Sequence, residues 1–123
     1  MPKRILIADD NAGFRQVIKD HLRRAFQIIH HEAANGREAV ELAAISQPDL
    51  IILDVCMPEM DGIATAKHLK ARMPEIPVVL FTMYKLDGSA STLGVDAVIS
   101  KLHFSSLVDT VSALLNLNVP VAG

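Results

Sequence analysis

The feature that most limits the fold of this chain is the stretch from Pro48 to Gly62. Residues 50–53 form an uninterrupted apolar run, which indicates a strand buried on both faces. The run ends in Asp54, and Pro58 and Asp61 then supply residues that are typical of turns. Asp54 is therefore predicted at the carboxyl end of a buried strand, where open α/β sheets bind their ligands.

Four other short apolar runs have the length of strands, so that the five predicted strands cover residues 5–8, 27–32, 50–53, 78–81 and 97–99. Between them, apolar residues recur with helical spacing in residues 13–26, 35–45, 61–73 and 107–115. Residues 85–93 are rich in glycine, serine and threonine, which predicts at most a short helix that frays easily. This alternation predicts an α/β fold, a doubly wound sandwich with a five-stranded parallel sheet between two helix layers.

Particular residues indicate where two helices start and which strand lies at the edge of the sheet. Asn35 with Glu38 three positions later resembles a capping box, and Asp61 is placed to cap the helix that follows it. His30 and His31 interrupt the run of residues 27–32, which suits an edge strand better than a central one. Adjacent side chains of a strand point to opposite faces, so we do not expect these two histidines to bind a metal together.

The composition indicates one compact domain. The chain has 123 residues, half of them hydrophobic, and its formal charge of -2 lacks the bias of a nucleic-acid binder. The basic residues of its first part are interpreted as a solvated helix face: Lys3, Arg4, Arg15, Lys19, Arg23 and Arg24. Cys56 is the single cysteine, which excludes an internal disulfide and agrees with a cytoplasmic location. The apolar run of residues 5–8 is too short for a signal peptide or a membrane span.

Polar residues stand directly after several predicted strands and should meet, because parallel strands leave a sheet at the same edge. They are Asp9, Asp10, Asp54, Thr82 and Lys101. Three carboxylates this close would repel one another unless a cation compensates their charge. Oxygen ligands that are few and open to solvent suit Mg²⁺, which keeps several waters and joins one or two carboxylates to a phosphate.

The remaining two residues suit a phosphoryl group. Lys101 offers a positive charge and Thr82 a hydrogen-bond donor for phosphate oxygens. Asp54 is then the candidate nucleophile, because a carboxylate can take up a phosphoryl group as an acyl phosphate. The cation and Lys101 would offset the charge that develops during this transfer.

These residues resemble the receiver domain of two-component response regulators, of the kind found in chemotaxis regulators. The resemblance covers about residues 3 to 117 and rests on Asp9-Asp10, Asp54, Met57-Pro58, Met60-Asp61-Gly62, Thr82 and Lys101. It implies a flavodoxin-like three-layer fold with strand order 2-1-3-4-5. It also implies that Asp54 accepts phosphate from a histidine kinase and that Thr82 and Lys101 report the phosphate to the rest of the domain. By the same resemblance, Mg²⁺ would be held by Asp9, Asp10, Asp54 and the backbone carbonyl of Cys56.

The resemblance also implies a setting for the chain. Residues 1–117 would form the receiver domain, and residues 118–123 a tail or the start of a linker to an output domain that is not in this chain. The partner would be a sensor histidine kinase or a phosphotransfer protein, and residues 83–117 could form a homodimer face. No membrane contact is expected, and transcription regulation or nucleic-acid binding would pass through the output domain only. The chain would be no enzyme, apart from catalysing its own phosphotransfer and dephosphorylation.

Two residues depart from the family pattern. Val98 stands three positions before Lys101, where receivers usually carry an aromatic residue, and Leu102 replaces the customary proline. A cis peptide without proline costs about 3–4 kcal/mol, so we predict a trans bond between Lys101 and Leu102. Because no ring at Val98 can carry the signal, we expect the response to phosphorylation in residues 83–102. Tyr84 is then either an exposed loop residue or a substitute reporter.

Three other classes of protein remain open. A hydrolase of the haloacid dehalogenase type also uses an aspartate after a strand, with a threonine and a lysine, but usually has a second acid where Cys56 stands. A flavodoxin-like FMN-binding domain would need a phosphate loop where Asp9 and Asp10 would repel the phosphate. A phosphorylation-independent interaction module is kept open by Val98 and Leu102.

Overall fold

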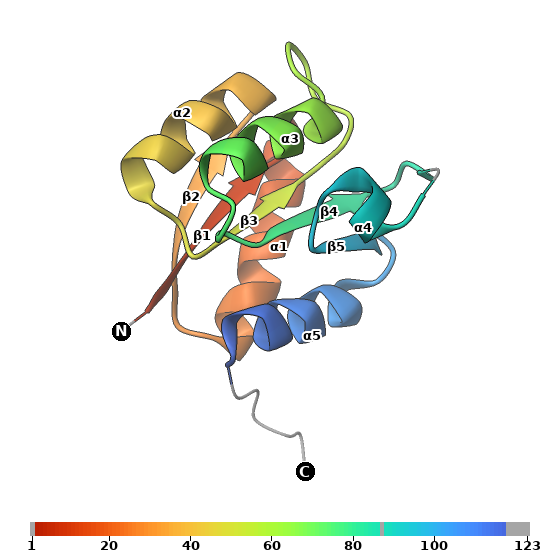
Figure 1. Ribbon diagram of the computed structural model, residues 1–123. Coiled ribbons are helices and arrows are strands. Elements are labelled where there is room, and N and C mark those ends of the chain that lie inside the picture. The colour runs from red at the N-terminus through yellow and green to blue at the C-terminus, as the bar shows by residue number, and fades with distance from the viewer. Residues whose placement is uncertain (1, 87, 118–123) are drawn as a thin grey trace.

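The computed structural model describes residues 2–86 and 88–117, which form five strands and five helices in strict alternation (Figure 1). The elements are β1 (Lys3–Ala8), α1 (Ala12–Ala25), β2 (Ile28–Ala33), α2 (Gly36–Ser46), β3 (Leu50–Leu53), α3 (Gly62–Arg72), β4 (Val78–Thr82), α4 (Ala90–Leu93), β5 (Ala97–Ser100) and α5 (Phe104–Leu115). The tail or linker predicted for residues 118–123 lies outside the described residues.

The strands form one parallel sheet in the order β2-β1-β3-β4-β5, which confirms the predicted flavodoxin-like order 2-1-3-4-5. In Figure 1, α1 and α5 lie on one side of the sheet and α2 and α3 on the other. The chain leaves β1 for β2 on one side and returns to β3 on the other, so the direction of winding reverses between β1 and β3. Such a switch point opens a crevice at the carboxyl ends of the strands.

Both faces of the sheet are buried, because alternate residues of each central strand point into opposite helix layers. Ile7 and Ile52 pack among the residues of α1 and α5, whereas Leu6 and Leu53 pack among those of α2 and α3. None of the four is more than 1% exposed. Burying a side chain of this size contributes about 1.5–3 kcal/mol, so the ends of these strands are held on a rigid base.

The helix starts follow local sequence signals. Asn35 Oδ1 accepts a hydrogen bond from Glu38 N at 2.8 Å, and Asp61 caps α3 in the same way. Glu38 bonds back to the backbone N–H of Ala34, one residue before the position that a capping box uses. Asn11 caps α1, so this helix begins at Ala12, one residue earlier than the sequence pattern predicted.

The segment predicted to form a weak helix contains α4, which has four residues and ends at Gly94 in the left-handed conformation. Beyond it, Val98 is 37% exposed and shares a pocket with Tyr84 and Met83. Leu102 is 72% exposed. No cis peptide bond occurs among the described residues, so the trans bond predicted between Lys101 and Leu102 is confirmed.

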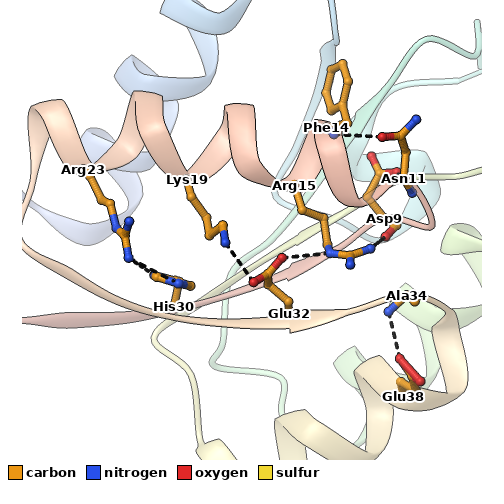
Figure 2. A network of polar contacts seen from close by, with 10 residues as sticks. All are labelled: Asp9, Asn11, Phe14, Arg15, Lys19, Arg23, His30, Glu32, Ala34 and Glu38. Carbon is orange, nitrogen blue, oxygen red and sulfur yellow. Dashed lines mark hydrogen bonds and ion pairs between the residues drawn. The ribbon is translucent and has the colours of Figure 1, made fainter.

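The solvated helix face that we predicted for the basic residues is wrong at four positions. Lys3 and Arg4 belong to strand β1 and not to a helix. Arg15 and Lys19 do lie on α1, but they form ion pairs and are largely buried. Arg15 Nε and Lys19 Nζ on α1 each lie 2.9 Å from a carboxylate oxygen of Glu32 on the edge strand β2 (Figure 2). Their side chains are only 15% and 10% exposed. The next residue of this row, Arg23, contacts His30, and burial together with the Arg23 charge lowers the pKa of that histidine. The basic residues therefore attach α1 to the sheet.

Candidate functional site

Three aspartates meet at the carboxyl edge of the sheet. Asp9 follows β1 and donates its backbone N–H to Ala33 O of β2, and Asp54 follows β3 and donates its N–H to Ala8 O of β1. These bonds extend the parallel ladders by one residue on each strand. One ligand atom from each of Asp9, Asp10 and Asp54 lies within 4.8 Å of the others. Fold and register thus bring together acids that are 45 positions apart in sequence, as the count from Asp9 to Asp54 shows.

Lys101 lies between two of these acids. Its Nζ is 2.7 Å from Asp9 Oδ2 and 2.9 Å from Asp54 Oδ2, and its side chain is 8% exposed. Burial acts to lower the pKa of Lys101, but its hydrogen bonds to Asp9 and then to Asp54 outweigh this effect, so the pKa is raised from its usual value. The ammonium is therefore fully charged at neutral pH.

Asp9 is hydrogen-bonded through both its side chain and its backbone. Its Oδ1 accepts a hydrogen bond from Asn11 N at 2.9 Å, and its carbonyl oxygen accepts one from the guanidinium of Arg15. Figure 2 shows Arg15 between this carbonyl and Glu32. Asp9 is 1% exposed, whereas Asp10 is exposed and, among the described residues, its side chain accepts no hydrogen bond. The pair of adjacent acids thus consists of one fixed and one free carboxylate.

Asp54 depends on the loop that follows it. Its Oδ1 accepts a hydrogen bond from Val55 N at 2.7 Å, and Val55 O accepts one from Gly62 N at 2.9 Å. A methyl group added to Gly62 would overlap the carbonyl oxygen of Asp54. The glycine that the sequence placed after a turn is therefore required because α3 begins directly against the backbone of the candidate nucleophile.

Thr82 is the last residue of β4, between the strands that deliver Asp54 and Lys101. Its carbonyl oxygen accepts a hydrogen bond from Lys101 N at 3.0 Å, and its hydroxyl accepts one from Tyr84 N at 3.0 Å. Thr82 is 3% exposed. In this arrangement the hydroxyl is bonded to the following loop, so any contact with a phosphate would couple that loop to the site.

The acids fit a hard divalent cation. Three carboxylates face one ammonium, which leaves two negative charges uncompensated when all are ionised. Carboxylate and carbonyl oxygens are the ligands that Mg²⁺ prefers. Among the described residues, no backbone N–H is bonded to the carbonyl oxygen of Cys56, so this acceptor can also bind a cation. The cluster of Asp9, Asp10 and Asp54 is therefore suited to a hard divalent cation, and the role of the Cys56 carbonyl as a further ligand stays a prediction.

One neighbour of the site was missed at the sequence level. The Nζ of Lys101 lies 4.1 Å from the ring centroid of Phe14, on the first turn of α1. This ring packs with Phe81 of β4 and Phe104 of α5, at centroid distances of 6.1 and 5.6 Å. In the sequence, Phe14 is one of the apolar residues of the helical pattern over 13–26, and its position four residues after Asp10 is the one sign that it could reach the site.

A pocket of about 250 Å³ adjoins the site on the side of β5. Residues 82–86 and 98–100 line it, so Thr82, Tyr84 and Val98 share one hollow. Tyr84 and Val98 are 60% and 37% exposed. The pocket lies where the response to phosphorylation is predicted.

A doubly wound parallel sheet with an acidic cluster and a buried lysine at its strand ends defines the class: a flavodoxin-like α/β domain with a charged site at its switch point. Within that class, the chain belongs to the response regulator receiver domain family, whose model matches residues 5–112. None of the helices in the described part of the chain is long and apolar enough to cross a membrane.

Individual proteins agree with this assignment. The chain is 41% identical over 95 residues to a protein-glutamate methylesterase/protein-glutamine glutaminase of Pseudoalteromonas atlantica, in a match that covers 76% of this chain and 24% of that relative. It is 40% identical over 80 residues to the chemotaxis protein CheY of Thermotoga maritima, covering 65% of this chain and 67% of CheY. The receiver domain of the Francisella response regulator 1452 has a similar structure, with a TM-score of 0.81 and 28% identity over 93% of this chain and 97% of that one. The chain therefore spans only a fraction of the methylesterase that it resembles.

Proposed function

We propose that this domain is a phosphorylation switch in which Asp54 accepts a phosphoryl group, in a Mg²⁺-dependent transfer, from a sensor histidine kinase or a phosphotransfer protein. The observation that carries the proposal is the position of the Asp54 carboxylate, 2.9 Å from a buried ammonium and beside two further acids at the sheet edge. Membership of the receiver family supports the phosphorylation switch over a hydrolase or a flavin-binding domain.

The transfer requires one bond to form and one to break. A carboxylate oxygen of Asp54 bonds to phosphorus while the phosphorus–nitrogen bond of a phosphohistidine breaks. The electron pair of that bond stays with the imidazole, which leaves as neutral histidine when its other nitrogen carries a proton. Lys101 already donates a hydrogen bond to Asp54 Oδ2, so its charge is in place for the phosphoryl oxygens without rearrangement of the backbone. Thr82 would donate its hydroxyl to the same group.

The acids of the site would hold the cation that the transfer requires. Asp9, Asp10, Asp54 and the Cys56 carbonyl are the proposed ligands for Mg²⁺. When bound, the ion would neutralise charge on the phosphoryl oxygens. Asp9 keeps its orientation through Asn11 and Arg15, so one ligand is fixed before any ion binds.

The proposal extends to the bounds of the domain, its location and its contact surfaces. Residues 1–117 would be the receiver domain, with no catalytic activity beyond its own phosphotransfer and dephosphorylation, in the cytoplasm. Residues 83–117 would offer a homodimer face, and nucleic acid or transcription would be reached through an output domain only.

The experiment is intact-mass measurement after incubation with acetyl phosphate and Mg²⁺. We expect one phosphoryl adduct in the parent protein, none in Asp54→Asn, and none in excess EDTA. Asp109→Asn, which changes an exposed aspartate of α5, serves as the matched control and should be phosphorylated like the parent. Unchanged labelling of Asp54→Asn would show that another residue accepts the phosphoryl group, and labelling in EDTA would show that the metal assignment is wrong.

A phosphorylation-independent interaction module is the second candidate. The exposed Val98 and Leu102 favour it, because they replace the aromatic residue and the proline that receivers usually carry three positions before and one position after the lysine. A parent protein that takes up no phosphoryl group under any of these conditions would support this candidate.

A further inference from the structure

Among the described residues, the ammonium of Lys101 contacts two acids and one aromatic ring. The two carboxylate contacts, at 2.7 Å to Asp9 and 2.9 Å to Asp54, use two of the three N–H bonds of the ammonium. The third neighbour is the ring of Phe14, whose centroid is 4.1 Å from Nζ. A cation within about 6 Å of the face of a phenylalanine ring is attracted by the electron density of that face. The ammonium is therefore confined between two acids and one ring.

The ring of Phe14 is itself held by three elements. Its residue lies in the first turn of α1, where Phe14 N donates a hydrogen bond of 2.9 Å to the capping side chain of Asn11. In Figure 2 the ring and the Arg15 side chain leave α1 in opposite directions, so one turn of helix contacts the site through both. The ring packs with Phe81, which is 1% exposed, and with Phe104 on α5. It cannot turn away without disturbing both neighbours.

We propose that Phe14 is a positioning residue, which holds the ammonium of Lys101 between Asp9 and Asp54 and so readies it for the phosphoryl group. The inference rests on the proposed function, because it concerns how Lys101 serves the transfer to Asp54. An apolar residue without a π face would fill the same space but would leave one side of the ammonium without attraction. The ammonium would then sample positions away from Asp54, and phosphorylation would slow.

The aromatic cluster offers a matched control. Phe104 packs against Phe14 and, at 5.2 Å, against Phe81, but it is Phe14 that lies under Lys101. Phe14→Leu and Phe104→Leu therefore remove one ring each from the same cluster, and the first alone removes the ring beside the ammonium. Phe14→Tyr keeps the π face and is the conservative variant.

The first measurement is the rate of adduct formation with acetyl phosphate at saturating Mg²⁺. We expect Phe14→Leu to slow it about 5- to 10-fold, Phe104→Leu less than about 2-fold, and Phe14→Tyr to restore most of the rate. Equal slowing by Phe14→Leu and Phe104→Leu, or no slowing by Phe14→Leu, would overturn the proposal. If Phe14→Leu does not fold, phenylalanine analogues with successively more ring fluorines at position 14 replace it. The rate should then fall steadily with the number of fluorines, and a flat series would overturn the proposal.

The second measurement needs neither phosphate nor metal, so it separates this proposal from the proposed function. The ε-methylene protons of Lys101, assigned by comparison with Lys101→Arg, should show a ring-current shift in the NMR spectrum of the parent. We expect this shift to disappear in Phe14→Leu and to persist in Phe104→Leu. Its persistence in Phe14→Leu would overturn the placement of the ammonium, even in a protein that proved unable to accept a phosphoryl group.

Discussion

The three aspartates of the site have different surroundings. Asp9 and Asp54 are 1% and 7% exposed, and each carboxylate bonds to Lys101 and to a backbone N–H. Asp10 is exposed, and the described residues provide it with no such partner. In the absence of a cation, its charge therefore repels its two neighbours without compensation.

Asp10→Asn should accordingly act in opposite directions on stability and on metal binding. We expect the metal-free variant to be more stable than the parent by about 1 kcal/mol, because one repelling charge is removed close to two others. We also expect Mg²⁺ to bind the variant at least about 10-fold more weakly, because it loses one of few protein ligands. Urea unfolding in EDTA measures the first effect and isothermal titration with Mg²⁺ the second. A variant that is less stable than the parent without metal, or that binds Mg²⁺ equally well, would contradict the role given to Asp10.

At the scale of elements, the site depends on two connections. The loop from β3 to α3 returns to the strand through the bond from Gly62 N to Val55 O, directly beside Asp54. On the other side of the switch point, α1 is attached to the edge strand through Glu32, and one of the basic residues involved also holds the Asp9 carbonyl. The first connection fixes the residue next to Asp54, and the second fixes Asp9 through its own backbone.

Gly62→Ala should therefore lower both the stability of the domain and its phosphorylation at Asp54. Its methyl group would overlap the Asp54 carbonyl oxygen, and overpacking against backbone costs about 1–3 kcal/mol. We expect a loss of at least about 2 kcal/mol and a large fall in adduct formation with acetyl phosphate. Gly94→Ala is the control: its φ of 73° disfavours alanine, but its side chain would enter open space far from this loop. Normal phosphorylation of Gly62→Ala would show that the start of α3 does not position Asp54.

The ion pairs that Glu32 of β2 forms with Arg15 and Lys19 of α1 should make the stability of the protein depend on pH. The hydrogen bond from Lys19 lowers the pKa of Glu32, burial opposes this, and Arg15 adds to the lowering. A carboxyl with a lowered pKa in the folded state contributes stability above its usual pKa, and this contribution is lost as the pH falls through the lowered value. At pH 7 we expect Glu32→Gln to cost about 1 kcal/mol, because one carboxylate serves two cations.

This difference should shrink as the pH falls below about 4. Urea unfolding of parent and variant across that range measures it, with Glu41→Gln, an exposed glutamate of α2, as the control. A difference in the free energy of unfolding between parent and Glu32→Gln that stays constant or grows at low pH would show that the ionised carboxylate does not supply this stability.

The sequence was sufficient to predict the elements because their signals are local. The apolar run of residues 50–53, the caps at Asn35 and Asp61, and the weak helix before Gly94 all reappear in the structure. What failed depends on pairing across the sheet: nothing in the sequence of α1 shows that Glu32 will lie beneath Arg15 and Lys19. The contact of Phe14 with Lys101 was missed for the same reason, since an apolar stripe does not reveal which of its members borders a charge.

At the scale of the molecule, the candidate site borders a surface with exposed hydrophobic residues and only a short helix. Met83, Tyr84, Val98 and Leu102 are all exposed large hydrophobic residues, and α4 between them has four residues. Thr82 belongs to both regions, because its hydroxyl is bonded to Tyr84 N. This hydroxyl can donate to a phosphoryl group while it accepts from Tyr84 N, so a shift of the hydroxyl toward phosphate would move the loop as well. Family resemblance predicts the site residues, but this surface follows from Val98 and Leu102, where the chain departs from the family.

Amide hydrogen exchange with beryllofluoride, a phosphate mimic, should therefore change mainly in residues 83–86 and 88–102. The low local stability of this segment predicts the largest change in protection there. Asp54→Asn with beryllofluoride is the control and should show no change. A response centred on residues 13–45, with 88–102 unchanged, would place the output surface on α1 and α2 instead.

The central claim is that Asp54 itself receives the phosphoryl group. The measurement that tests it most directly is reduction of the phosphorylated protein with borohydride, followed by peptide mass mapping. Hydride attacks the acyl carbon of an acyl phosphate, phosphate leaves, and further reduction yields homoserine in place of aspartate. We predict homoserine at position 54 after incubation with acetyl phosphate and Mg²⁺, and aspartate at position 54 when either is omitted. Homoserine at Asp9 or Asp10 with position 54 unchanged, or no homoserine in a protein that carries the adduct, would contradict the account.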